Sequence, residues 1–508
     1  SNGASSEQLF YFQHAQRIHK NVHIGFKYMV ANSPGYYNRN AVINNGFLFT
    51  GDFLSNNKKY QALLVLYTNK LLNHESGGLT NVEGFIDDQR VDSILYYNAE
   101  SRYRDRGLKL RHSYLTGFYT EAKDTLDQSR FINLGKFSHT LELSRRSSIF
   151  ENSDKPIKYS DFSIRDTVST LDSTRVFYLE NTISYSYLPL KTSKRKFPLT
   201  FSVFISSRLY DINTDKEMVF INDTLRGQRK SDRFNCFVQG GSLATDPELP
   251  LSLKAYAELI KGGYYDNDYK IEGGIMFGKA SSNIRLEGDL KLSGEHAPYY
   301  ASRFYSNTYF WENNFDQTTS LAFRAQAFYK RQKLGLSYYL INKPIFFNNL
   351  AFPEQNEGMV NIIGPFIENH FNWKALEFNS LVIYQYVSSD KFERLPELLA
   401  NISVLANIKL FKGSLLTQIG LEMNYNTPYS PMGFNPVSRV FYNHDSDMSE
   451  QHIFLDPFLT AKIKRTRFFV KFQDVLGFLP NNKLVFPIAN YPIPSPAFKF
   501  GLSWMFFD

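Results

Sequence analysis

Apolar and polar residues alternate along this chain in stretches of about ten residues, repeated from one end to the other. In Asn283–Gly294, Leu286 and Leu290 stand at apolar positions and charged residues fill the positions between them, and the same alternation recurs in Thr319–Lys330 and Leu415–Tyr425. Successive side chains of a strand point to opposite faces, so each stretch predicts a strand with one apolar and one polar face. A strand of about ten residues crosses a bilayer at a tilt of ~45°. The pattern therefore predicts membrane-spanning strands around a polar lumen.

The same reading applied to the whole chain predicts strands at regular intervals. They are centred on residues 7–18, 21–30, 43–55, 59–71, 107–119, 134–148, 175–188, 198–210, 232–241, 251–262, 268–279, 283–293, 319–330, 333–343, 358–371, 375–387, 400–410, 414–425, 452–463, 466–477 and 497–507. No apolar run is long enough for a membrane-spanning helix, and the mean hydropathy is −0.34. A β-barrel reconciles low hydropathy with a membrane, because only half of each strand meets lipid.

We therefore predict an all-β fold in which residues 1–508 form one large transmembrane, antiparallel, up-and-down β-barrel of about 20–22 strands. A soluble β-sandwich or propeller is the competing interpretation, but aromatic residues make up 16% of the chain, as expected of the aromatic girdles of a membrane barrel. We expect no plug domain. That expectation disfavours the 22-stranded outer-membrane transporters whose lumen is plugged.

The predicted connections alternate between tight turns and long polar segments. Tight turns are expected at residues such as 56–58, 372–374 and 464–466. Long loops are predicted near residues 72–106, 149–174, 211–231, 294–317, 426–451 and 478–496. Bacterial barrels have short periplasmic turns and long extracellular loops, so we expect the long segments outside the cell.

The predicted strand directions conflict with the even number of strands that bacterial barrels have. The strand at 7–18 ends in a tight turn and the strand at 497–507 follows a long loop, so both run toward the periplasm. An odd number of strands results, whereas single-chain bacterial barrels close with an even number. We expect either a strand before Ser1 or an error in the interpretation of 358–371 or 121–133.

Charged residues at the polar positions of the strands are predicted to line the lumen, because Arg or Lys facing lipid at the bilayer midplane costs ~2–4 kcal/mol. These residues are Lys27, Lys136, Glu142, Arg208, Lys254, Glu258, Lys270, Glu272, Arg285, Glu287, Asp289, Lys291, Arg324, Lys330, Lys409, Glu422, Lys462 and Lys471. They could be solvated around a pore or paired between strands into a ladder. Cations outnumber anions among them, which predicts a weak preference for anions.

The remaining chemistry of the chain is sparse. Cys236 is the single cysteine, which excludes an internal disulfide, and we interpret it as an inert residue facing lipid. The ten histidines are scattered, with none in a hydrolase or metalloprotease motif. His444, Asp445 and Asp447 could bind a divalent cation, although a solvated loop explains them more simply. We expect no enzyme activity, no cofactor and no metal site.

The two ends of the chain carry a family resemblance. The last residues, 497–508, read AFKFGLSWMFFD, and the N-terminal part contains SNGASSEQ at 1–8 and KLLNHESGGL at 70–79. A long-loop segment at 166–172 reads DTVSTLD. Together these resemble the putative porin family of Bacteroidota outer membranes. The alternating aromatic ending resembles the signal by which barrels are recognised for insertion into the outer membrane, carried here by Phe500, Leu502, Trp504 and Phe506.

The resemblance implies a channel in the outer membrane of a Gram-negative bacterium. The predicted function is passive diffusion of small hydrophilic solutes, and the alternative is a non-conducting barrel subunit of a larger outer-membrane assembly or transport or secretion complex. Outer-membrane lipid and lipopolysaccharide are the expected partners, with other outer-membrane or surface proteins as a further class. The basic residues are spread along the chain (net charge +8), which argues against nucleic acid.

Overall fold

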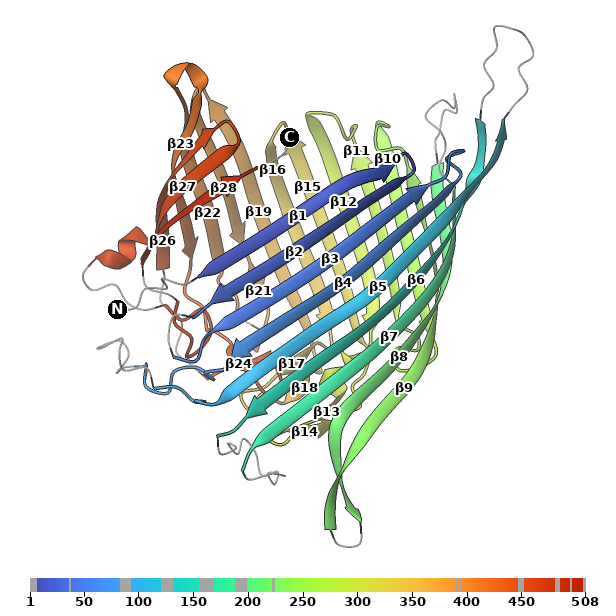
Figure 1. Ribbon diagram of the computed structural model, residues 1–508, viewed down its shortest axis with the longest axis vertical. Helices are drawn as coiled ribbons and strands as arrows, with labels where there is room; N and C mark the ends of the chain where they lie inside the picture. Colours follow the sequence, from blue (N-terminus) through green and yellow to red (C-terminus); the bar gives the residue numbers. More distant parts are fainter. Residues whose placement is uncertain are drawn as a thin grey trace.

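One large antiparallel sheet of 22 strands dominates the structure, a computed structural model of the chain. Figure 1 shows its tilted strands, with β1–β9 crossing the near wall and the later strands behind them. The structure describes residues 7–35, 38–82, 93–119, 131–154, 168–187, 199–221, 224–389, 391–392, 394–445, 452–479, 485–493 and 496–505, and the side chains of 119 and 215–230 are not described.

The long strands of the sheet coincide with the alternating stretches of the sequence. They are β1 (Gln8–His19), β2 (Val22–Ser33), β3 (Val42–Leu54), β4 (Tyr60–His74), β5 (Ala99–Tyr119), β6 (Phe131–Asn152), β7 (Thr170–Tyr187), β8 (Leu199–Ile221), β9 (Thr224–Thr245), β10 (Leu251–Lys261), β11 (Tyr269–Phe277), β12 (Ile284–Glu295), β15 (Thr318–Tyr329), β16 (Gln332–Asn342), β19 (Met359–Trp373), β20 (Leu376–Tyr384), β21 (Tyr386–Val387), β22 (Leu398–Leu410), β23 (Leu415–Asn426), β26 (His452–Ile463), β27 (Thr466–Gln473) and β28 (Ala497–Trp504).

Each long strand pairs with the next one along the chain, always antiparallel. The same order continues from β9 through β12, β15, β16 and β19 to β28. Both β20 and β21 pair with β19, so they are two parts of one crossing interrupted at Gln385. The first and last strands therefore run in the same direction. Within the described residues, no pairing joins β1 to β28.

The fold-class prediction of about 20–22 strands is wrong in its strand count. The described residues form 28 strands, and six of them build three two-stranded sheets inside the long connections. These hairpins are β13 (Arg303–Tyr305) with β14 (Phe310–Glu312), β17 (Ile345–Phe347) with β18 (Pro353–Gln355), and β24 (Gly433–Asn435) with β25 (Val440–Tyr442). Their strands have three residues each, too few for alternation to reveal. All three gather toward the lower end of the sheet in Figure 1.

The predicted loop at 211–231 is also wrong, because β8 and β9 continue through it and pair from Leu199 to Ile221. Residues 358–371, suspected as a misreading, do form β19, whereas the suspected connection at 121–133 lies largely outside the described residues. Besides strands, the structure has the short helix α2 (Tyr299–Ser302) and the 3-10 turns η1 (Phe411–Gly413) and η2 (Val475–Phe478).

No helix among the described residues is both long and apolar enough to span a membrane.

The two faces of the sheet differ as the alternation predicts. Large apolar side chains such as Leu286 (53% exposed), Ile205 (62% exposed) and Phe500 (77% exposed) project from one face, which we call the outward face. Phe498, Leu502 and Trp504 lie on it as well, whereas Phe506 lies outside the described residues.

Cys236 does not face lipid as the sequence suggested. It lies opposite Arg208 on the inward face and is buried, and a Cβ added at Gly263 would lie 2.9 Å from its sulfur.

Adjacent residues of one strand should differ sharply in their tolerance of charge. We expect Leu286→Lys and Leu421→Lys to block folding in lipid, because both side chains project from the outward face. Arg285→Gln and Glu422→Gln should leave a folded barrel, because these residues belong to the inward, polar face. Heat-modifiable gel migration measures folding. Equal tolerance of the two pairs would contradict the assignment of the faces.

Candidate transport pathway

Charged side chains form an ordered row across four neighbouring strands of the inward face. Lys109 of β5, Glu142 of β6, Glu180 of β7 and Arg208 of β8 lie directly opposite one another in the strand register. Lys109 Nζ lies 2.7 Å from Glu142 Oε2, and Arg208 Nε lies 3.0 Å from Glu180 Oε1. A cation thus stands at each end of a pair of adjacent carboxylates. Like charges directly opposite one another destabilise a sheet, so the two ion pairs compensate for the central repulsion.

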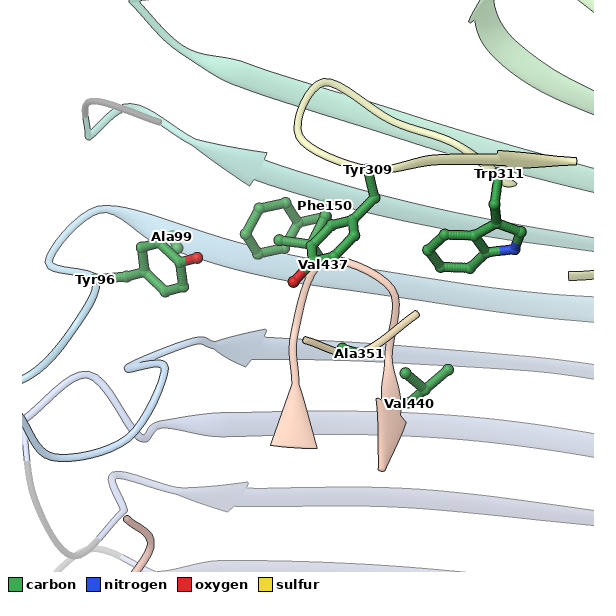
Figure 2. Packing of buried hydrophobic residues seen from close by; sticks show 8 residues of the cluster. All are labelled: Tyr96, Ala99, Phe150, Tyr309, Trp311, Ala351, Val437 and Val440. Atoms are coloured by element: carbon green, nitrogen blue, oxygen red, sulfur yellow. The ribbon is translucent and has the colours of Figure 1, made fainter. Parts of the chain in front are cut away.

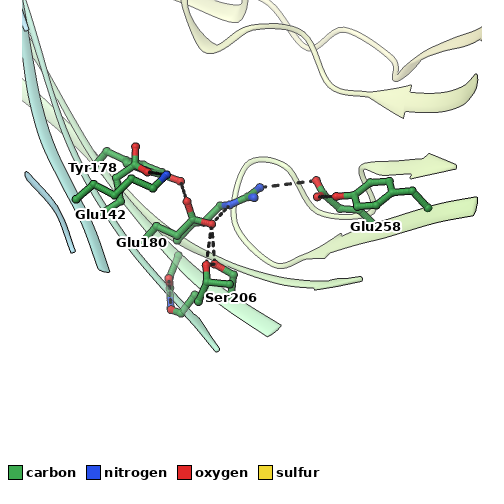
Figure 3. Close-up of polar contacts among 11 residues, drawn as sticks. Glu142, Tyr178, Glu180, Ser206 and Glu258 are labelled. Atoms are coloured by element: carbon green, nitrogen blue, oxygen red, sulfur yellow. Dashed lines mark hydrogen bonds and ion pairs between the residues drawn. The ribbon is translucent and has the colours of Figure 1, made fainter. Parts of the chain in front are cut away.

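Glu180 is the centre of the network in Figure 3. Its carboxylate accepts hydrogen bonds from the Tyr178 hydroxyl (2.6 Å) and the Ser206 hydroxyl (2.8 Å). Arg208 also reaches toward Glu258 of β10, at 3.9 Å, and Glu258 accepts a hydrogen bond from the Tyr256 hydroxyl at 2.5 Å. Charge-assisted hydrogen bonds of this kind are about twice as strong as neutral ones. The network therefore ties β7, β8 and β10 together across the wall.

A second ion pair spans an entire strand. Lys254 Nζ of β10 lies 2.7 Å from Asp289 Oδ1 of β12, although β11 runs between them. The residue of β11 at this level is Gly274, and a Cβ there would lie 2.2 Å from Lys254 Cε. Glycine at this position thus leaves the space through which the lysine side chain crosses. Any larger residue would displace the ion pair.

Most of the other predicted lumen charges form pairs of opposite sign. Lys270 pairs with Glu272 (2.7 Å) and Lys291 with Glu295 (4.0 Å). The remaining pairs are Arg285 with Glu287 at 2.7 Å, and Lys471 with both Glu422 and Asp456 at 2.8 Å. The ladder interpretation of the sequence thus describes this part of the wall.

Five predicted cations have no carboxylate partner among the described residues. Arg324 donates to the Ser337 hydroxyl at 3.3 Å, and Lys27 lies over the ring of Tyr11. The other three are Lys136, Lys409 and Lys462. Lys330, in contrast, is not a wall residue: it stands in the tight turn between β15 and β16 with a φ of 57° and lies over the ring of Tyr329. The alternation at the end of β15 was extended one residue too far.

A recess of about 550 Å³ opens in this polar wall. Its charged and aromatic lining includes Lys254, Glu272, Lys291, Arg324 and Tyr339. The volume lies within the ~300–1,000 Å³ range of small-molecule sites. A second recess, of about 590 Å³, is lined mainly by outward-facing residues such as Leu253 and Ile275, but it shares Lys254 and Asp289 with the first recess.

The long connections pack against one another into a cap at one end of the sheet. Its core contains Tyr96, Phe150, Tyr309, Trp311 and Val437, drawn in Figure 2. These residues come from different connections and from the loop ends of β5 and β6, far apart in the sequence. The Trp311 ring stacks on Phe304 at 4.7 Å and meets Tyr309 edge-on at 6.0 Å. Buried aromatic contacts of this kind give the connections a common hydrophobic core.

Hydrogen bonds attach the cap to the inner wall. Asn307, from the connection between β12 and β15, donates its backbone N–H to Asp172 Oδ1 at 2.8 Å and its side-chain amide to Thr170 Oγ1 at 3.0 Å. Arg303 pairs with Asp232 at 2.9 Å. Asp172 lies on β7 and Asp232 on β9, at inward positions of the register. This connection therefore folds inward over the wall.

Burial perturbs the pKa of Glu75 and of Arg439 in the cap. Burial raises the pKa of Glu75 above its usual value, and the nearby charge of Arg439 only partly opposes this. Burial likewise lowers the pKa of Arg439, while Glu75 and Asp172 act in the opposite direction. Both groups lie in the long connections.

The sequence did not reveal several residues of this pathway. Glu180, Tyr178 and Asp456 stand at inward positions of predicted strands, but their partners become visible only once the register between strands is known. The cap residues have no local signal, because their contacts join distant segments. Among the described residues no group of three His, Cys, Asp or Glu could hold a metal ion, and Asp447 of the suspected cation site lies outside them.

A sequence model described as "putative porin" matches residues 1–508, the whole chain. The chain belongs to the putative porin family. A β-barrel of the outer membrane is the setting that this membership and the fold together support. No curated protein matches this porin in sequence.

Solved structures with a similar fold include siderophore receptors and a copper transporter. The siderophore receptor PirA from Acinetobacter baumannii aligns with a TM-score of 0.68 at 10% identity, covering 99% of the porin and 78% of the receptor. The ferric enterobactin receptor PfeA from Pseudomonas aeruginosa, in a mutant form, gives 0.65 at 11% identity, with 98% and 77% covered. The copper transporter OprC gives 0.66 at 11% identity, with 99% and 78% covered.

These neighbours complete the correction of the fold class. We predicted a simple barrel without a plug and on that basis set it apart from 22-stranded transporters with a plugged lumen. That separation is wrong, because the porin shares its barrel-like fold with siderophore receptors, which contain a plug domain.

The stability of the cap should depend on pH through Glu75. Its pKa in the folded porin is raised above the ordinary value of 4.5, so protonated Glu75 stabilises the cap. This contribution is complete below pH 4.5 and is lost as the pH rises through the raised pKa. We expect faster hydrogen exchange of cap amides with rising pH, after correction for intrinsic base catalysis. Glu75→Gln should remove this dependence, and an unchanged pH profile in that variant would contradict the assignment.

Proposed function

We propose that this chain is an outer-membrane channel through which small hydrophilic solutes diffuse passively. The observation that carries the proposal is the inward face, where charged and hydroxyl side chains follow the wall from β5 to β15 and, together with apolar residues, line the 550 Å³ recess. Such a wall would not be needed around an apolar, solid interior. It offers hydrogen bonds to a polar solute that leaves bulk water.

We further propose a weak preference for anions. Most charges of the wall neutralise one another in ion pairs, so they contribute little net field. Lys27, Lys136, Arg324, Lys409 and Lys462 have no carboxylate partner among the described residues, and they leave the wall with a positive excess. Arg324 lies at the recess itself, where a positive charge would act on a passing solute at short range.

The cap favours a second candidate, a non-conducting barrel that acts within a larger assembly or transport complex. Packed connections cover one end of the sheet and bond to its inner wall. The solved structures with a similar fold include a siderophore receptor and a copper transporter. In the channel proposal the same cap forms a constriction.

Three further assignments belong to the proposal. The long connections face the outside of the cell, in line with the asymmetry of bacterial barrels. The source is a Gram-negative bacterium of the Bacteroidota, which rests on the sequence resemblance alone. The chain has no catalytic role.

Planar-bilayer recording tests the channel. We expect stable ohmic steps from the purified chain and a reversal potential of anionic sign in a KCl gradient. The combined substitutions Lys136→Gln, Arg324→Gln and Lys462→Gln should move that potential toward zero or beyond, because they remove positive excess from the wall. The matched control changes three exposed turn lysines, Lys58→Gln, Lys412→Gln and Lys464→Gln, and should leave selectivity unchanged. A folded barrel without steps would favour the non-conducting subunit.

The cap should control how often the channel conducts. Trp311→Ala removes a side chain that is 5% exposed. Truncation of such a buried residue costs ~3–5 kcal/mol of stability, and in this protein the cap loses that stability because Trp311 packs within it. We expect a larger open fraction in bilayers and faster exchange of cap amides. Leu350→Ala, at a 51% exposed position of the same cap, is the control and should change neither. If the cap amides exchange faster but the open fraction of the channel stays the same, the cap does not control gating.

A further inference from the structure

Five basic side chains gather on the outward face, near the loop ends of β4–β7. In the strand register Lys70 lies directly opposite Arg104, and Arg106 lies directly opposite Arg145. Arg175 stands on the same level as Arg104, with Ser147 between them. We call these five residues the basic patch. Directly opposed strand residues have Cβ atoms ~4.5–5.5 Å apart, so the patch contains two close pairs of like charge.

No residue in the part of the chain that the structure describes neutralises the basic patch. Within the described residues, none of its five side chains forms an ion pair or a hydrogen bond. The inward face at the same height is different, because Arg146 pairs with Asp105 there at 3.6 Å and Lys109 with Glu142 at 2.7 Å. Arg102, one step farther from the membrane, is also paired, with Glu100 and Glu151. Two opposed cation pairs without a counter-ion indicate that an anion from outside the chain lies between them.

The position of the basic patch identifies the kind of anion. The next outward level toward the tight turns consists of four leucines, one on each strand: Leu66, Leu108, Leu143 and Leu179. The apolar belt therefore begins one level, or ~7 Å, from the arginines.

The far edge of the belt is marked by Phe118 and Ile132, which are 53% and 40% exposed. From Leu108 to Phe118 the strand extends ~33 Å, which is ~25 Å along the membrane normal at a tilt of ~40°. This is the height of the apolar band of an outer-membrane barrel. The basic patch thus lies at the headgroup level of the leaflet on the side of the long connections.

We propose that the basic patch binds the phosphate groups of a phosphorylated glycolipid of the outer leaflet, whose acyl chains lie along the row of leucines. Arginine suits this role, since its planar guanidinium forms paired hydrogen bonds with phosphate. A phosphate between Arg106 and Arg145 relieves their repulsion, and Lys70, Arg104 and Arg175 surround a second position. The proposal rests on the proposed orientation in the outer membrane, with the long connections outside, but not on conduction.

Binding of purified lipid A to the detergent-solubilised barrel tests the basic patch. We compare lipid A carrying its phosphates with enzymatically dephosphorylated lipid A. Wild-type protein should bind the phosphorylated form at least about tenfold more tightly, and added salt should weaken it. The combined substitutions Arg104→Gln, Arg106→Gln and Arg145→Gln should abolish the difference between the two lipids. The control with Lys58→Gln, Lys412→Gln and Lys464→Gln removes the same charge from the opposite end and should preserve it.

Each other outcome overturns the proposal. Equal binding of both lipids by the wild type would show that the leucines alone hold the lipid. An unaltered preference in the triple variant would place the phosphates elsewhere. Tighter binding of soluble polyphosphate than of lipid A would assign the patch to a soluble anion. Heat-modifiable migration checks folding, and if the triple variant fails to fold, Arg106→Gln alone must still weaken the phosphate preference. No arm requires conductance, so failure here is distinct from failure of the channel.

Discussion

Backbone hydrogen bonding in lipid is the constraint on which this structure depends. A peptide group inside a bilayer has no water to bond, so every strand must find a partner on both sides. The chain meets this demand in the simplest order, each long strand pairing with the next. In that order, alternate residues of each strand face opposite sides of the sheet. This alternation decides where the polar network, the leucine row and the basic patch lie. The two edges β1 and β28, which run the same way, are the places where this demand is left open among the described residues.

The register between strands brings charged residues that are distant in sequence side by side on the inward face. Lys109, Glu142, Glu180 and Arg208 come from four successive strands, yet they occupy one level of the sheet. A slip of one residue in any of these strands would turn its charge to lipid, which couples the folding of the barrel to the pairing of its charges. Gly274 illustrates the same dependence on register. The Lys254–Asp289 ion pair can cross β11 only because the residue of β11 at that level has no side chain. The wall is thus specified by small residues as much as by charged ones.

How far the sequence predicted the structure depends on whether the signal was local. Alternation located every long strand, because two-residue periodicity is visible within ten residues. It could not find β13 or β24, which have only three residues each. Their surroundings depend on contacts between connections: Tyr309 and Trp311, which follow β13, pack against Phe352, and Asn435 of β24 donates to the Tyr309 hydroxyl. Parity assigned the charge of Arg208 and Glu422 to the inward face but not their partners, which depend on register. Cys236 was assigned to the wrong face because its neighbours Phe234 and Val238 are apolar yet point inward, where Tyr264 and Tyr265 cover Phe234.

The same parity argument separates two uses of positive charge in this chain. Inward cations such as Arg208 and Lys254 have carboxylates at 2.7–3.0 Å, so their charge holds neighbouring strands together. Outward cations such as Arg106 and Arg145 face each other directly beside leucines, and no described carboxylate pairs with either. A sheet that needed charge only for stability would not place two arginines opposite one another where a Glu would pair with either. The outward arrangement therefore makes sense as recognition of something negative outside the protein, and the inward one as the structure of the wall itself.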